Sequence, residues 1–169
     1  VRALRDCPAP VIASVEGFAV GAAWGLVLAC DLVVASREAF FAAPFAQRAL
    51  VADAGLAWSL ARNVGHQRAA ELLLLGERLP AVAAHEQGLV TRLVEPGQAR
   101  EHALDLARRL AEGPADAIRL TKALLCRAPS VALDAFLDEE YVHVALNGHS
   151  PDVTEGRQAF LDKRPPRFR

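Results

Sequence analysis

The sequence predicts an α/β fold in which a mixed region of strands and helices is followed by a run of helices. Two observations predict it. Short apolar runs rich in β-branched residues stand between glycines and prolines over the first 45 residues, and a helical period of 3.6 becomes clear from Ala99 onward. A chain of 169 residues, 53% of them hydrophobic, can bury about two thirds of its unfolded surface. We expect the mixed region to occupy residues 1–97 and the helical region residues 98–169.

The first region is expected to run strand, helix, strand, strand. The β-branched run over residues 10–16 is closed by Gly17, a pattern typical of a buried strand. The next segment is almost wholly apolar and rich in glycine and alanine, which favours a buried helix that begins near Gly21. The four elements are expected over residues 10–16, 21–29, 31–36 and 39–43.

The remainder is expected to be mainly helical, with glycine and proline between the helices. Ser130 is a plausible N-cap, because a hydroxyl there can accept a bond from a free N–H group of the first turn. The expected elements are helices over residues 53–63, 67–75, 81–87, 99–110, 114–125, 130–146 and 155–163, with one strand over residues 89–94. The apolar faces of the last helices can either cover their own core or pack against a partner chain, and the sequence leaves both open.

Charge and composition exclude several function classes. The formal charge of −1 gives no reason to expect nucleic acid or an anionic membrane surface as a partner, and no apolar run reaches the roughly 18 residues of a transmembrane helix. The three cysteines show no CxxC spacing and are expected to be free thiols of a reducing, cytoplasmic compartment. The five histidines show no ligand spacing, so no metal site is expected.

Four segments resemble, in order and with matching spacing, the enoyl-CoA hydratase/isomerase (crotonase) superfamily. They are residues 8–31, 65–76, 84–90 and 155–164. The resemblance implies a crotonase-like (ClpP/crotonase) spiral β/β/α core up to residue 97, then a helical oligomerisation and CoA-lid region. It also implies that the early part of the domain, upstream of Pro8, is absent from this chain. The implied partners are an acyl-CoA substrate, whose coenzyme A is the only cofactor-like group, and copies of the chain in a homotrimer or hexamer.

The resemblance assigns one oxyanion donor, the backbone N–H of Ala22, which follows Gly21. The start of a helix presents unpaired N–H groups and a positive dipole end, and a small residue lets a thioester approach. Such a donor is typically worth about 3 kcal/mol in the transition state. The family's second donor belongs to the loop upstream of Pro8. Close helix packing is a compatible second reason for the small residues here.

The family's hydratases use two glutamates, and their positions fall on Gly25 and Phe45. Neither residue can transfer a proton, so hydration by paired carboxylates is not expected. Asp53 is the replacement candidate, since in several family isomerases an aspartate at the matching position faces the acyl group. One carboxylate in an apolar pocket is the minimum for moving a proton between two carbons. The alternative is that Asp53 caps the following helix, and both roles can coexist.

Four further residues are candidates for substrate contacts. Phe160 and Lys163 match positions that in the family reach the CoA adenine and phosphate of an adjacent subunit, and the alternative is a solvated helix end. Trp24 and Trp58 could narrow the acyl pocket, with a place in the core as the alternative for each.

The expected function is that of an acyl-CoA enzyme of fatty acid metabolism, an isomerase-type proton shuttle with one aspartate and a backbone oxyanion hole. A non-catalytic acyl-CoA-binding or assembly subunit is an alternative, motivated by the missing glutamates and the missing early part. A third is residual hydratase or lyase chemistry with water held by other groups.

Overall fold

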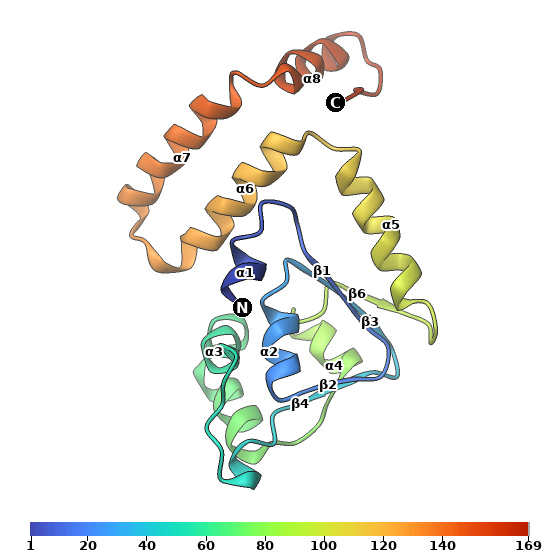
Figure 1. Cartoon of the computed structure of the whole chain (residues 1–169), viewed down its shortest axis with the longest axis vertical. Coiled ribbons are helices and arrows are strands. Elements are labelled where there is room, and N and C mark those ends of the chain that lie inside the picture. Colours follow the sequence, from blue (N-terminus) through green and yellow to red (C-terminus); the bar gives the residue numbers. More distant parts are fainter. Residues whose placement is uncertain (169) are drawn as a thin grey trace. The chain divides into compact units, whose positions relative to one another are not determined.

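A computed structural model describes residues 1–168, and these residues form two compact units (Figure 1). The first comprises residues 1–7 and 11–106, and the second comprises residues 8–10 and the chain from residue 107 onward. The division after residue 97 that the sequence favours stays a prediction.

The first unit holds two three-stranded sheets. One has the order β1-β3-β6 and is wholly parallel, with β1 (Ile12–Val15), β3 (Leu32–Ser36) and β6 (Arg92–Val94). The other has the order β2-β4-β5, in which β4 pairs parallel with β2 and antiparallel with β5; its strands are β2 (Phe18–Val20), β4 (Phe40–Ala42) and β5 (Leu79–Pro80). Parallel neighbours need crossover connections, and α2 supplies one of them.

Helices cover these sheets and complete the core. They are α1 (Arg2–Arg5), α2 (Ala22–Leu28), a 3-10 turn η1 (Ala46–Arg48), α3 (Leu56–Leu75), α4 (Ala81–Glu86) and α5 (Ala99–Ala111), which runs on into the second unit. The largest fully buried apolar side chains are those of Trp24, Phe41, Leu56, Leu60 and Leu79. The core therefore lies where α2 and α3 meet the β2-β4-β5 sheet.

The second unit is helical. After α5 come α6 (Ala115–Arg127), a 3-10 turn η2 (Ala128–Ser130), α7 (Leu133–Asn147) and α8 (Pro151–Leu161). Helices α6 and α7 pack together, and the Lys122 ammonium of α6 donates to the carbonyl oxygen of Ala9 at 3.0 Å. No residue of α7 is buried.

The structure confirms most expected elements and differs from the expectation at five. Strands β2 and β5 were not expected. The helix predicted from Asp53 begins at Leu56, and its predicted interruption is confirmed at Gly65, where φ is 78° and ψ is 167°. Ser130 is not an N-cap: it ends η2, and its hydroxyl donates to the carbonyl of Arg127. Helix α8 begins at Pro151, ahead of the predicted start at Glu155.

None of the helices within residues 1–168 is both long and apolar enough to cross a membrane. Within residues 1–168, no group of three or more histidine, cysteine, aspartate or glutamate side chains is placed so that it could hold a metal ion.

Candidate active site

The amino end of α2 carries the predicted oxyanion donor. Gly21 precedes the helix with φ of 62° and ψ of −128°, and its own N–H donates to Ala42 at 2.9 Å. Ala22 is the first helical residue and is exposed. Within residues 1–168 its N–H meets no hydrogen-bond acceptor. This is the geometry that an anion-binding backbone donor needs, while the role itself stays a prediction.

Phe45 lies against the same end of α2. A Cβ built on Gly21 would stand 3.6 Å from Cζ of Phe45, so the ring packs on the glycine that starts the helix. The side chain is buried and directly precedes η1. Phe45, one of the two positions to which the resemblance assigns a hydratase glutamate, thus places an apolar ring beside the start of α2, and its contact with substrate stays a prediction.

Gly25, the other such position, is buried under the backbone of a distant segment. A Cβ built on Gly25 would stand 2.6 Å from the Ala54 carbonyl oxygen and 2.8 Å from its Cβ. Both distances are shorter than van der Waals contact allows. The segment 53–55 thus lies directly on α2, and a glutamate at this position would collide with it.

Asp53 belongs to this segment. Its side chain is exposed within residues 1–168, and an apolar pocket around it stays a prediction. Its expected role as a helix cap is wrong, because Gly55 precedes α3 and no side-chain cap bond is made there. The Asp53 carbonyl, not its carboxylate, accepts the N–H of Leu56 at 3.0 Å. Within residues 1–168 the carboxylate accepts no hydrogen bond, so its oxygens are available to a ligand.

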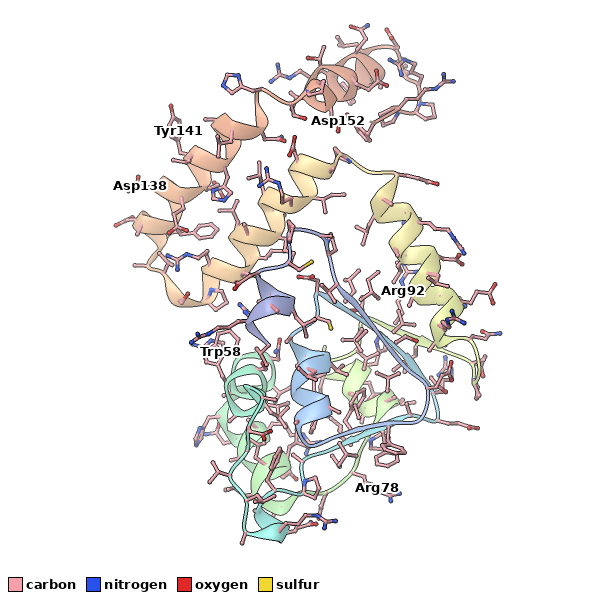
Figure 2. The ribbon with its side chains drawn as sticks, viewed as in Figure 1. Trp58, Arg78, Arg92, Asp138, Tyr141 and Asp152 are labelled. Carbon is pink, nitrogen blue, oxygen red and sulfur yellow. The ribbon has the colours of Figure 1, made fainter. Side chains whose placement is uncertain are left out.

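The two tryptophans have opposite environments. Trp24 is fully buried and stacks on Phe41 with ring centroids 5.6 Å apart, so within this chain it is a core residue and not a wall of an acyl pocket. Its Nε1 has no hydrogen-bond partner among the described residues. Trp58 is 41% exposed, which makes the core interpretation wrong for it. The Cζ atoms of Arg5 and Arg62 lie 4.8 Å and 4.1 Å from the centroid of its ring. Figure 2 labels Trp58.

Glu16, which directly follows strand β1, has a structural role at the start of α5. Its carboxylate accepts the N–H groups of Gly97 at 3.0 Å and Ala99 at 2.6 Å. It therefore satisfies free donors at the start of α5. The partners lie more than 80 residues apart in the chain, and no local pattern could have indicated this bond.

Phe160 and Lys163 lie together at the carboxyl end of α8. Phe160 is 83% exposed, and the Lys163 N–H donates to its carbonyl oxygen at 3.2 Å. Lys163 is exposed and adopts a left-handed φ of 52°. Exposure suits both a nucleotide contact and a solvated helix end, so the CoA contact stays a prediction.

Comparisons with known proteins give a consistent result. A family model described as enoyl-CoA hydratase/isomerase matches residues 1–169. The chain is 41% identical to the 1,2-epoxyphenylacetyl-CoA isomerase of Escherichia coli K12, covering 99% of this chain and 64% of that protein. It is 37% identical to the 2,3-dehydroadipyl-CoA hydratase of the same organism, covering 95% of this chain and 63% of that protein.

Solved structures agree in fold. The crystal structure of an enoyl-CoA hydratase from Polaromonas sp. JS666 superposes with a TM-score of 0.95 at 40% identity, covering 99% of this chain and 65% of that one. A putative enoyl-CoA hydratase from Streptomyces coelicolor A3(2) gives the same TM-score at 43% identity, covering 99% and 62%. The chain thus spans 62–65% of the length of these relatives.

Proposed function

Because the chain belongs to the enoyl-CoA hydratase/isomerase family, we propose that it is an isomerase-type enzyme that moves a proton between carbons of an acyl-CoA thioester. Its crotonase-like α/β fold, predicted from the sequence, is confirmed by the TM-score of 0.95. Asp53 is the proposed proton carrier, and the N–H of Ala22 is one proposed donor to the thioester oxygen.

One observation supports the choice of isomerisation over hydration. The resemblance puts the two hydratase glutamates at Gly25 and Phe45, and the backbone of Ala54 fills the space beside Gly25. No carboxylate can enter there while the segment keeps this conformation. Asp53 belongs to the same segment and directly precedes Ala54, the residue that lies against Gly25.

The proposed reaction needs only one acid–base group and an oxyanion donor. The Asp53 carboxylate removes a proton from the α-carbon, and the C–H electron pair shifts into a dienolate whose oxygen accepts the Ala22 N–H. The protonated Asp53 then returns the proton to the γ-carbon, which leaves the double bond one position along. A backbone donor of this kind contributes about 3 kcal/mol to the transition state.

The test is Asp53→Asn, which keeps the size of the side chain and removes its basicity. We expect kcat to fall by about 10²- to 10⁴-fold. Conversion of a non-conjugated enoyl-CoA is followed by absorbance of the conjugated thioester. Asp138→Asn, an exposed aspartate of α7, is the matched control and is expected to keep wild-type activity. An Asp53→Asn variant with unchanged kcat contradicts the proposal.

A non-catalytic acyl-CoA-binding or assembly subunit is the second candidate. The observation that favours it is the solvent exposure of Asp53, since an enclosed carboxylate is better suited to proton transfer. Isothermal titration with an enoyl-CoA separates the two: binding without turnover supports the second candidate. Detection of a 3-hydroxyacyl-CoA product would instead support hydration, the type of activity in the name of the 2,3-dehydroadipyl-CoA hydratase of Escherichia coli.

The remaining partners follow from the same assignment. Coenzyme A enters as part of the substrate, with Phe160 and Lys163 as its proposed contacts, and no separate cofactor is required by the reaction. Within residues 1–168 none of the three cysteines forms a disulfide, which suits the proposed cytoplasmic compartment.

A further inference from the structure

We infer that Gly25 is a positioning residue, because its missing Cβ sets how closely the segment that carries Asp53 approaches α2. This inference rests on the proposed function and adds a residue that takes no part in proton transfer. It explains why glycine, rather than another small residue, occupies a buried position inside a helix.

The contact is made with backbone, which cannot move aside cheaply. A Cβ on Gly25 would stand 2.6 Å from the Ala54 oxygen, 2.8 Å from its Cβ and 3.1 Å from its carbonyl carbon. At Gly113, by comparison, the nearest atom is the flexible Cδ1 end of Ile118, also at 2.8 Å. Gly17 has nothing within 4 Å. Gly25 is therefore the one glycine within residues 1–168 whose added Cβ would meet a backbone atom closer than 3.0 Å.

Ala54 is held in place from the other side. It and Gly55 adopt left-handed φ values of 49° and 70°, a tight turn that leads directly into α3. The turn is closed by the Leu56 N–H on the Asp53 carbonyl, and Leu56 is fully buried. Moving Ala54 away from α2 would therefore disturb the first turn of α3.

The contact links the two proposed catalytic groups. Gly25 lies three residues after Ala22 on α2, and Ala54 is the neighbour of Asp53. The spacing between the Ala22 N–H and the Asp53 carboxylate thus depends on how closely residues 25 and 54 approach. A misplacement of about 1 Å in such an arrangement can cost about 10²-fold in rate.

The test is Gly25→Ala in the natural-length protein. We expect kcat to fall by about 10²-fold with KM changed less than about threefold, because the groups that bind CoA are untouched. In an unobstructed helix the same change stabilises, since alanine loses less backbone entropy than glycine. Here we expect a lower Tm. Gly17→Ala, made in open space, is the matched control and should leave kcat unchanged.

A second variant separates positioning from general damage. Gly25→Ala combined with Ala54→Gly removes the Ala54 Cβ and relieves its left-handed backbone, so the segment can adjust. We expect kcat of the double variant to be at least tenfold higher than kcat of Gly25→Ala alone. All activities are divided by the folded fraction measured by circular dichroism.

The outcomes are distinct. An inactive Asp53→Asn together with a fully active Gly25→Ala overturns the positioning role and leaves the proposed function standing. Failure of Ala54→Gly to restore kcat, or a loss explained entirely by the folded fraction, also overturns it. A fully active Asp53→Asn overturns the proposed function and this inference with it.

Discussion

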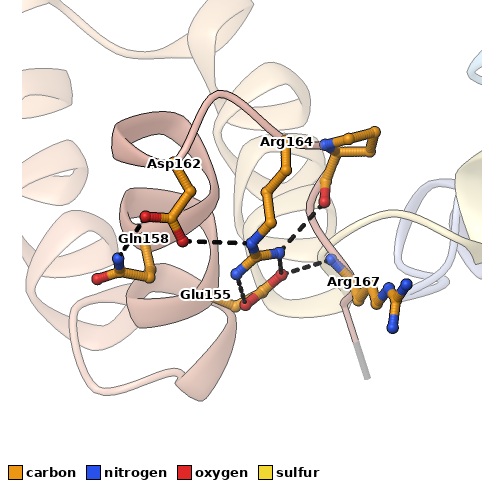
Figure 3. A network of polar contacts seen from close by, with 6 residues as sticks. Glu155, Gln158, Asp162, Arg164 and Arg167 are labelled. Atoms are coloured by element: carbon orange, nitrogen blue, oxygen red, sulfur yellow. Dashed lines mark hydrogen bonds and ion pairs between the residues drawn. The ribbon is translucent and has the colours of Figure 1, made fainter.

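Glu155 holds the chain that follows α8 against that helix (Figure 3). Its carboxylate accepts two bonds from the Arg164 guanidinium, at 2.7 Å and 3.0 Å, and one from the Arg167 N–H at 2.7 Å. The bonds from Arg164, followed by the one from Arg167, lower the pKa of Glu155 from 4.5 to about 2. The carboxylate is thereby kept charged well into the acid range.

This pair predicts an acid-sensitive tail. A carboxylate with a depressed pKa stabilises above its unfolded pKa, so the contribution is full above about pH 4.5 and is lost as the pH falls toward about 2. A carbon-13 NMR titration should place the Glu155 midpoint near 2, and the Arg167 N–H resonance should move with it. Glu155→Gln should abolish that movement of Arg167. A Glu155 midpoint near 4.5 would refute the ion pair in solution.

The start of helix α5 is held by a carboxylate from a distant part of the sequence. The Glu16 carboxylate accepts the N–H groups of Ala99, the first residue of α5, and of Gly97, two residues before it. We expect Glu16→Ala to lower the free energy of unfolding by about 1 kcal/mol, the usual value of a lost cap. Urea denaturation monitored by circular dichroism measures it. Glu112→Ala, at the opposite end of α5, is the control, and equal losses for both variants would contradict the cap.

Among the elements, those with long patterns were predictable and those made by pairing were not. Strand β5 has only two residues, and β2 lies between Gly17 and Gly21 without a β-branched run; both exist because β4 pairs with them. The start of α3 is set by the left-handed turn at Ala54 and Gly55, which gave no signal in sequence. Ser130 has the right chemistry for a cap but takes part in a 3-10 turn instead.

The candidate site divides in the same way. The resemblance identified Gly21, Ala22 and Gly25 because they share one contiguous segment. The contact between Gly25 and Ala54 joins segments far apart in the chain, so only the folded structure reveals it. Trp58 shows that residue type alone does not predict burial, because this large apolar side chain lies at the surface beside the guanidinium groups of Arg5 and Arg62.

On the scale of the whole molecule, α7 carries an apolar surface that the other helices of the second unit leave uncovered. The exposed side chains Leu133, Leu137, Tyr141 and Val144 follow at spacings of four, four and three residues, which places them on one helix face. Their exposures are 69%, 48%, 76% and 65%. Monomeric proteins rarely leave such a face in water. This favours the second of the two readings of the apolar helices, packing against a partner chain.

We therefore expect a homo-oligomer, a trimer or hexamer as the resemblance implies, that buries this face of α7. Leu137→Lys combined with Tyr141→Lys should release smaller species, because a charge buried without a partner is costly. Size-exclusion chromatography with light scattering measures the mass. Asp138→Lys adds positive charge beside the face and should leave the mass unchanged (Figure 2). A wild-type monomer, or an unaltered mass for the double variant, would show that α7 covers no subunit contact.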